Sequence, residues 1–126
     1  MKLHLDRFDG QNAFTGYGDG HVLINHRRHE TSLVVFPDRL VDPWPVSHPD
    51  ELTEASLAFL AAEPLEVLLI GTGPTMKLLH PKLYRQIAAA RIGVEVMATP
   101  AACRTYNILL GESRKVAAAI IISALR

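Results

Sequence analysis

The sequence predicts one α/β domain over residues 1–126, with three layers around a central mixed, mainly parallel sheet and a β-hairpin near the N-terminus. Two buried-strand patterns and the helical pattern between them carry this prediction. Residues 67–70 are apolar on both faces and end at Gly71, and residues 94–97 are expected to form a second buried strand. A strand, helix and strand within about 30 residues are typical of a right-handed crossover between two parallel strands.

The first 46 residues predict β-structure and loops. Strand-like runs lie at residues 21–25 and 31–36. The polar segment 26–30 between them is typical of an exposed hairpin tip. Trp44, which stands between two prolines, is expected to be an apolar plug at the edge of the core.

Three helical patterns follow the N-terminal part. From residue 47 apolar side chains recur every three to four positions, as in an amphipathic helix. Pro81 opens a second helix, for which Gly93 is the expected left-handed C-cap. A third helix is expected over residues 100–110, with Thr99 as its N-cap.

The closing run at residues 116–125 has two interpretations. Its three consecutive isoleucines favour a strand, whereas its alanines favour a helix. We expect a strand, because a strand here completes the sheet.

Composition excludes several classes of protein. The 126 residues hold 13 Lys and Arg against 13 Asp and Glu, with 48% hydrophobic residues and 21% charged. This balance excludes collagen, a coiled coil and bulk disorder. The longest uncharged runs have ten residues, about half of the roughly 20 that a membrane-spanning helix needs. A single cysteine, and an N-terminus without an apolar signal-peptide core, predict a cytoplasmic protein that is not an integral membrane protein.

The zero net charge conceals two halves of opposite sign. Residues 1–63 hold ten Asp and Glu against five Lys and Arg, and residues 64–126 hold three against eight. Attraction between the two halves inside one domain is the favoured interpretation, and an anion-attracting surface on the second half is the alternative. The basic residues are scattered, so no nucleic-acid partner is expected.

A glycine loop after the first buried strand is the strongest candidate site. Ligands of open α/β sheets bind beyond the carboxyl ends of the strands. The usual phosphate fingerprints fail, because the third glycine of such a motif falls at Met76. A structural turn is therefore favoured over a small-anion site. The candidate ligand-binding residues are Gly71, Thr72, Gly73, Thr99, Arg104, Asn107 and Arg114.

No complete catalytic or metal-binding set stands out. Cys103 in the first turn of a helix gains thiolate character, but a small buried thiol is the favoured interpretation because no histidine lies nearby in sequence. His26 and His29 are spaced like metal ligands, yet the arginines between them make a poor cation site. We therefore expect no catalytic residue, no metal and no cofactor.

The block at residues 93–119, GVEVMATPAACRTYNILLGESRKVAAA, closely resembles the C-terminal signature of one family. That domain-of-unknown-function family includes the mitochondrial respiratory complex I (NADH:ubiquinone oxidoreductase) assembly factor 3, the adipogenesis-associated domain protein and many small bacterial and archaeal proteins. The resemblance implies a three-layer α/β fold and a single-domain, bacterial-type member, since no mitochondrial targeting segment precedes the fold. Ala98 and Ser113 depart from the pattern. The family has no established catalytic activity.

Two functions are compatible with these observations. The first is a non-catalytic protein-binding domain that resembles an assembly factor and holds an unidentified protein partner. The second is a small-molecule or anion-binding protein, with or without catalysis, whose crevice lies at the carboxyl ends of the strands. The first is favoured, because the sequence lacks a complete catalytic arrangement.

Overall fold

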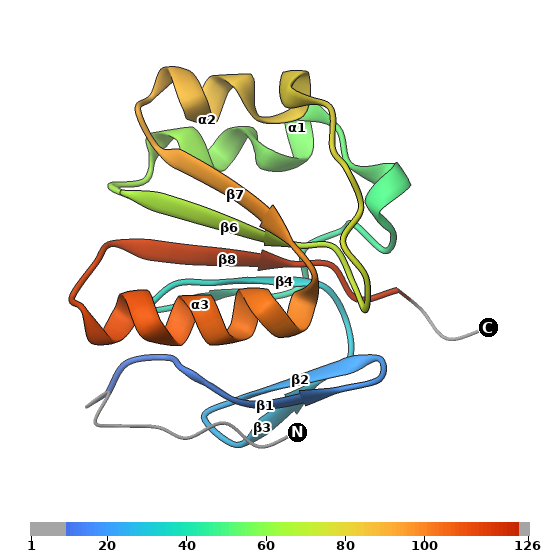
Figure 1. The fold of residues 1–126 in the computed structure, drawn as a ribbon, viewed down its shortest axis with the longest axis vertical. Helices are drawn as coiled ribbons and strands as arrows, with labels where there is room; N and C mark the ends of the chain where they lie inside the picture. Colours follow the sequence, from blue (N-terminus) through green and yellow to red (C-terminus); the bar gives the residue numbers. More distant parts are fainter. Residues whose placement is uncertain (1–9, 124–126) are drawn as a thin grey trace.

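The computed structural model describes residues 10–123, which form two β-sheets and the helices packed on them (Figure 1). The smaller sheet contains β1 (Phe14–Gly18), β2 (His21–Ile24) and β3 (Arg27–His29), all antiparallel. The larger sheet contains five strands in the order β5-β4-β8-β6-β7. The N-terminal β-structure of the prediction is thus confirmed as a separate, three-stranded sheet.

The five-stranded sheet is mixed. Strand β6 (Val67–Gly71) lies between β7 (Gly93–Met97) and β8 (Val116–Ile120) and runs parallel to both. Strand β4 (Leu33–Val35) pairs antiparallel with β8, and β5 (Leu40–Val41) pairs antiparallel with β4. Four of the five strands therefore point the same way, which confirms the predicted mixed, mainly parallel sheet. The strand interpretation of the closing run is confirmed for residues 116–120, and residues 124–125 of that run lie outside the described residues.

Helices cover both faces of this sheet. The helical segments are η1 (Pro49–Glu51), α1 (Glu54–Leu57), η2 (Ala58–Ala62), η3 (Pro81–Tyr84), α2 (Arg85–Ala89) and α3 (Thr99–Gly111). Segments α1 and α2 cover one face, α3 covers the other, and the three-stranded sheet packs against the outer side of α3 (Figure 1). None of the helices within residues 10–123 is long and apolar enough to cross a membrane.

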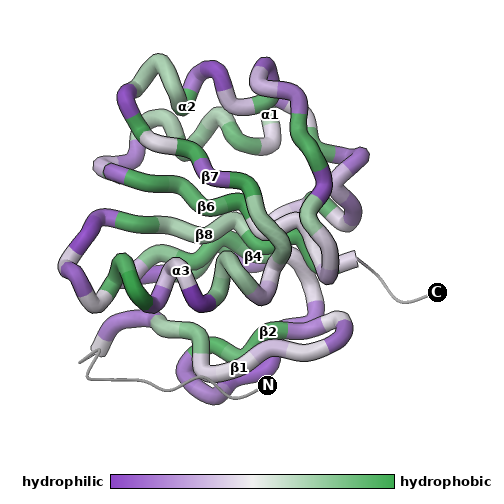
Figure 2. Tube along the Cα trace, viewed as in Figure 1, coloured by the Kyte–Doolittle hydropathy of each residue, from purple (hydrophilic) through white to green (hydrophobic). Residues whose placement is uncertain are grey.

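Alternation along the strands divides the core into two clusters, one on each side of the large sheet. Leu69 and Ala118 face the α3 side, whereas Leu68 and Ala119 face the α1 and α2 side. The central strands are hydrophobic along most of their length (Figure 2). This pattern is typical of strands buried on both faces, and the sequence predicts such strands for β6 and for residues 94–97. The prediction is confirmed for β6 and wrong for β7, which lies at the edge of the sheet and has only exposed or half-buried residues. Trp44 is 3% exposed, which confirms the predicted plug.

The predicted hairpin tip at residues 26–30 is wrong. Asn25 and His26 both have positive φ and close a tight turn, after which Arg27–His29 continues as β3. Two left-handed residues in succession match the twist of a two-residue hairpin, and asparagine tolerates this conformation. The partners of β2 are therefore β1 and β3, and the other predicted strand run, which contains β4, belongs to the larger sheet.

Two predicted helix caps are also wrong. The left-handed residue after α2 is Arg91, with φ 65°, whereas Gly93 already belongs to β7 and donates a hydrogen bond to the Glu66 carbonyl. Thr99 is the first residue of α3 rather than its N-cap, which is Ala98.

The first predicted helix is broken into three short segments. Thr53 and Ser56 form a reciprocal capping box that starts α1, so that only two residues separate α1 from the end of η1.

Candidate functional site

The glycine loop after β6 lies close against the start of α3. A Cβ atom added at Gly71 would lie 3.0 Å from Ile120 Cδ1 and 3.2 Å from Thr99 Oγ1. The Gly73 N–H donates to Thr99 Oγ1 at 2.9 Å, and the Thr99 N–H donates to the Gly73 carbonyl at 2.7 Å. The structure thus brings Gly71, Gly73 and Thr99 together, and it uses their polar groups to fasten the loop to the helix.

Thr72 fixes the other side of the same loop. Its side chain is buried, and its hydroxyl donates to the Thr75 carbonyl at 3.1 Å and accepts from the Lys77 N–H at 3.0 Å. Its own N–H donates to the Met97 carbonyl at 3.0 Å. The loop therefore folds back onto itself and onto the end of β7.

Asn107 joins α3 to the three-stranded sheet. Its side-chain amide accepts from the Phe14 N–H at 3.0 Å and donates to the Phe14 carbonyl at 2.8 Å, and the residue is 8% exposed. Tyr106, one position earlier, donates its hydroxyl to the Asn12 carbonyl at 2.8 Å and packs edge-on against the Phe14 ring at 5.2 Å. Burial raises the pKa of the Tyr106 hydroxyl. We call these contacts of Tyr106 and Asn107 with Asn12 and Phe14 the seam.

The two predicted arginines lie apart from the loop. Arg104 donates to the Tyr17 hydroxyl at 2.8 Å. Arg114 follows the far end of α3, a helix of 13 residues that spans roughly 20 Å, and it bonds Glu66 at 3.1 Å. The Lys115 backbone N–H first, and then Arg114, lower the pKa of Glu66. Ligand binding by the seven predicted residues stays a prediction, and the structure assigns their polar groups to contacts within the fold.

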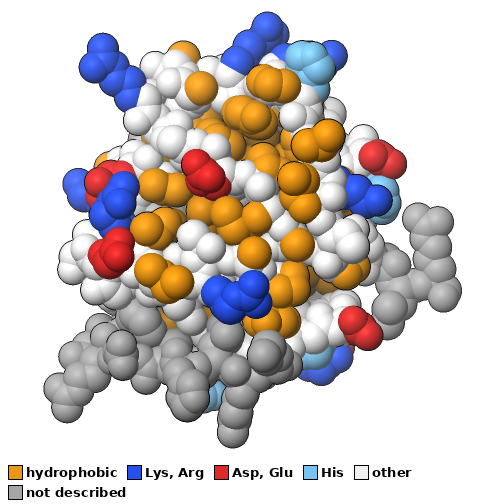
Figure 3. All heavy atoms as spheres, viewed as in Figure 1, with side chains coloured by type: hydrophobic (Ala, Val, Ile, Leu, Met, Phe, Trp, Pro, Cys, Tyr) orange, Lys and Arg blue, Asp and Glu red, His pale blue; other side chains and the backbone are white. Residues whose placement is uncertain are grey.

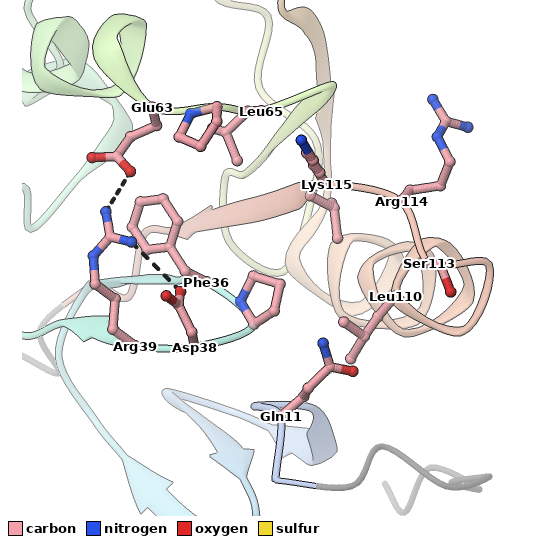
Figure 4. A pocket seen from close by; sticks show the side chains of 13 residues that line it. Gln11, Phe36, Asp38, Arg39, Glu63, Leu65, Leu110, Ser113, Arg114 and Lys115 are labelled. Atoms are coloured by element: carbon pink, nitrogen blue, oxygen red, sulfur yellow. Dashed lines mark ion pairs between the residues drawn. The ribbon is translucent and has the colours of Figure 1, made fainter.

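A surface cavity of about 380 Å³ lies where β6 and β8 begin, at the end of the sheet opposite to the predicted site (Figure 4). Arg39 points toward Glu63, with which it forms an ion pair at 2.5 Å, and its guanidinium lies 3.9 Å from the centroid of the Phe36 ring. Arg114 extends away from the cavity. Sequence reasoning missed this cavity, because its lining comes from four separate parts of the chain.

Cys103 is a buried thiol. It lies on the side of α3 that faces the core and is fully buried, which confirms the favoured interpretation of a small buried thiol. Burial raises its pKa to about 12, which disfavours the thiolate at neutral pH. Within residues 10–123, no group of three or more His, Cys, Asp and Glu side chains is arranged to hold a metal ion.

The outer edge of β7 has backbone groups that no other described strand uses. Gly93 donates to the Glu66 carbonyl, and the Met97 carbonyl accepts from Thr72, so the backbone groups of both residues point toward β6. Because backbone direction alternates along a strand, the N–H and C=O groups of Val94 and Val96 point outward. Among the described strands, β7 pairs with β6 alone.

Two other sheet edges, β5 and β3, carry protection that β7 lacks. Strand β5 has only two residues and is followed directly by Asp42 and Pro43. Strand β3 presents Arg27 and Arg28. Short edges, proline and basic side chains all discourage the addition of another strand. Strand β7 has five residues in unbroken register with β6 and contains no proline and no basic residue.

An apolar face surrounds the β7 edge. On the side of the molecule that Figure 3 shows, hydrophobic side chains gather over β7 and α3. Val94, Val96 and Met97 are half-buried there, and Ile108 on α3 is 61% exposed. Glu95 is exposed within β7, and within residues 10–123 no hydrogen bond or ion pair reaches its carboxylate. We call β7 and the exposed side of α3 the edge face.

Comparisons with known proteins identify the family and the fold. Residues 14–121 match the model of a family described as "Protein of unknown function (DUF498/DUF598)". A mouse protein named NADH dehydrogenase [ubiquinone] 1 alpha subcomplex assembly factor 3 is 38% identical over 90 residues, which cover 70% of this chain and 48% of the mouse protein. The chain spans about half the length of the vertebrate assembly factors that it matches.

Bacterial relatives match over nearly their whole length. A crystal structure of a protein from Bordetella parapertussis has a TM-score of 0.85 and 40% identity, covering 91% of this chain and 98% of that chain. A protein of Francisella tularensis named "13 kDa major membrane protein" is 28% identical over 122 residues, which cover 96% of this chain and 99% of that protein. The fold and the family resemblance that the sequence predicts are thereby confirmed.

Proposed function

The chain belongs to the family described as "Protein of unknown function (DUF498/DUF598)", and on this premise we propose that it is a non-catalytic protein-binding domain that helps to assemble a multisubunit complex. The edge face is the surface through which it holds its partner. The NADH dehydrogenase in the name of its mouse relative is the first complex to examine.

The observation that carries the proposal is the similarity to proteins named as assembly factors. That similarity reaches 38% identity to the mouse protein and 42% to a zebrafish protein of the same name. The edge face adds a physical reason, because an exposed strand edge within an apolar surface is a template for binding another chain. The internal bonds of the predicted crevice residues favour protein binding over a ligand-binding role.

The state of Cys103 favours a role without chemistry. This thiol is the most plausible nucleophile in the sequence, and it is buried with a raised pKa. A nucleophile must reach its substrate as a thiolate, and neither condition is met here.

Site-specific photo-crosslinking in the native host tests the proposal. A photoreactive phenylalanine analogue replaces Ile108 on the edge face in one strain, and Phe59 on η2 in the control strain; the two side chains are 61% and 39% exposed. We expect a crosslink from position 108 to a subunit of a multisubunit complex, identified by mass spectrometry, and none from position 59. Equal crosslinking at both positions, or a position-108 product that belongs to no such complex, contradicts the proposal.

A genetic experiment separates assembly from catalysis. Deleting the gene is expected to lower the amount of the assembled complex on native gels. A Cys103→Ala chain is expected to restore that amount as well as the wild-type chain does. If the alanine variant folds but fails to restore assembly, the non-catalytic proposal is wrong.

A further inference from the structure

We propose that β7 accepts an extended segment of the partner protein as a sixth strand, and that this segment places a Lys or Arg side chain opposite Glu95, between two apolar residues. The inference rests on the proposed function and narrows it: the partner is recognised by strand addition and by charge. Backbone direction, side-chain alternation and the unpaired carboxylate carry it.

The backbone of β7 leaves four hydrogen-bonding groups available to an added strand. These are the N–H and C=O groups of Val94 and of Val96, which point away from β6. An extended segment alongside β7 satisfies all four, as peptides do when they extend the edge of a sheet. No bulge interrupts the pairing of β7 with β6, so the edge is regular enough to continue the ladder.

The side chains of β7 set the chemistry of the added strand. Val94 and Val96 pack toward the α1 and α2 side of the sheet, and Met97 packs toward the α3 side. By alternation Glu95 shares the α3 side with Met97. A segment with apolar residues beside the two valines extends the existing core cluster. Its residue between them faces Glu95.

The charge of Glu95 determines which residue of the added strand fits opposite it. Arg104, a basic side chain on the exposed side of α3, is bonded to Tyr17, and within residues 10–123 Glu95 has no partner. Opposite charges on directly opposed residues of neighbouring strands stabilise the pair, and like charges destabilise it. A Lys or Arg therefore fits this position, and an Asp or Glu does not.

The same carboxylate argues against a second copy of this chain as the occupant. Two β7 strands from two copies of the chain could pair antiparallel. Only one register of that pair places Val94 of each copy opposite Val96 of the other, so that the outward N–H and C=O groups of both valines are all hydrogen-bonded. That register places Glu95 opposite Glu95, in a non-hydrogen-bonded pair whose Cα atoms are about 4.5 Å apart. Glu95 thus disfavours self-association at an edge that is otherwise open.

An NMR titration of the ¹⁵N-labelled full chain tests the inference. The probe is a blocked peptide of seven residues with a central lysine between two valines and with serine and threonine at its ends. The matched probe has glutamate in place of the lysine. We expect the lysine peptide to shift the amide resonances of Val94 and Val96 more than those of Gly93 and Glu95, whose amides already face β6. The glutamate peptide is expected to bind about tenfold more weakly.

Two variants make the titration decisive. Glu95→Lys is expected to reverse the preference, so that the glutamate peptide binds more tightly than the lysine peptide. Val94→Pro removes one outward N–H and is expected to abolish binding while the pairing with β6 persists. The inference is overturned if neither peptide shifts Val94 and Val96, or if both peptides bind the wild-type chain equally. If Val94→Pro does not fold, the charge reversal alone decides.

The outcome is distinguishable from that of the proposed function. If the lysine peptide fails to bind β7 while position 108 still crosslinks to a complex subunit, strand addition is wrong and the assembly role stands. If the peptide results hold while the crosslink is absent, β7 is a strand acceptor and the assembly role is wrong.

Discussion

The seam and the edge face lie on two sides of the same helix, α3. They differ in whether their polar groups are hydrogen-bonded within the fold. At the seam, the Asn107 amide occupies both backbone groups of Phe14, and the Tyr106 hydroxyl occupies the Asn12 carbonyl. At the edge face, the backbone groups of Val94 and Val96 point outward, and the Glu95 carboxylate has no partner within residues 10–123.

This difference distinguishes polar groups that stabilise the fold from polar groups that can bind another chain. A buried polar group without a partner is costly, so the seam had to satisfy each of its groups. An exposed group is satisfied by water, and it can exchange water for another chain at little cost. We therefore expect changes at the seam to lower stability, and changes at the edge face to alter binding with little effect on stability.

The largest effect is expected from Asn107→Leu. Leucine has a similar size but leaves both the N–H and the C=O of Phe14 unpaired in the core, which lowers the free energy of unfolding by about 3 kcal/mol. Urea denaturation followed by circular dichroism measures this loss. The control is Thr105→Ala on the same helix, for which we expect a change below about 0.5 kcal/mol. Similar losses in the two variants contradict the role of the seam.

A pair of proline variants tests the alternation along β7. Glu95→Pro removes an N–H that faces β6 and is expected to lower the free energy of unfolding by about 2 kcal/mol. Val94→Pro removes an N–H that faces outward, and we expect a loss of less than about 1 kcal/mol. Thermal or urea unfolding of both chains makes the comparison. The reverse order would mean that β7 presents Glu95 rather than the two valines to an added strand.

Tyr106→Phe separates packing from hydrogen bonding at the seam. The ring and its contact with Phe14 are kept, and the bond to the Asn12 carbonyl is lost. We expect the free energy of unfolding to fall by about 1 kcal/mol, the usual net value of one such bond. Urea titration of wild type and variant measures it. An unchanged midpoint would show that water replaces the hydroxyl at Asn12.

The smallest effect is expected from Glu66→Gln, and it depends on pH. The pKa of Glu66 lies below its ordinary value of 4.5 because the carboxylate accepts from the Lys115 backbone N–H and pairs with Arg114. The ionised form therefore stabilises the fold above pH 4.5, and this contribution is lost as the pH falls through the lowered pKa. Unfolding midpoints of the two chains should differ at pH 7 and converge in acid. A constant difference contradicts this assignment.

The strands and the helix of the second half were predictable because their signals are local. Strand β6 is an apolar run that ends at a glycine, β7 ends where a helix begins, and α3 begins beside a proline. Helix caps were predicted less well. Arg91, and not Gly93, takes the left-handed conformation after α2, because the helix ends earlier than its apolar pattern indicates.

In the candidate site too, local features were predictable from the sequence and long-range contacts were not. The proximity of Gly71, Gly73 and Thr99 follows from two parallel neighbouring strands, β6 and β7, whose carboxyl ends share one edge of the sheet. The hydrogen bonds between Asn107 and Phe14 join residues 93 positions apart. The hydrophobic periodicity of neither segment predicts this contact. The sequence analysis includes Arg114 among the candidate ligand-binding residues of the loop, yet the length of α3 places it at the opposite end of the sheet.

By itself the sequence determined the fold class, the positions of β6 and β7 along the chain and the family, because hydrophobic periodicity and a long signature are local properties of the sequence. Only the tertiary structure decided which polar groups remain available. Availability depends on which segments pack together: Thr99, Asn107 and Arg104 find partners inside the fold, whereas β7 falls at an edge of the sheet with Glu95 unpaired within residues 10–123. Hydrogen bonds between distant segments are set by packing, and packing is a property of the whole chain.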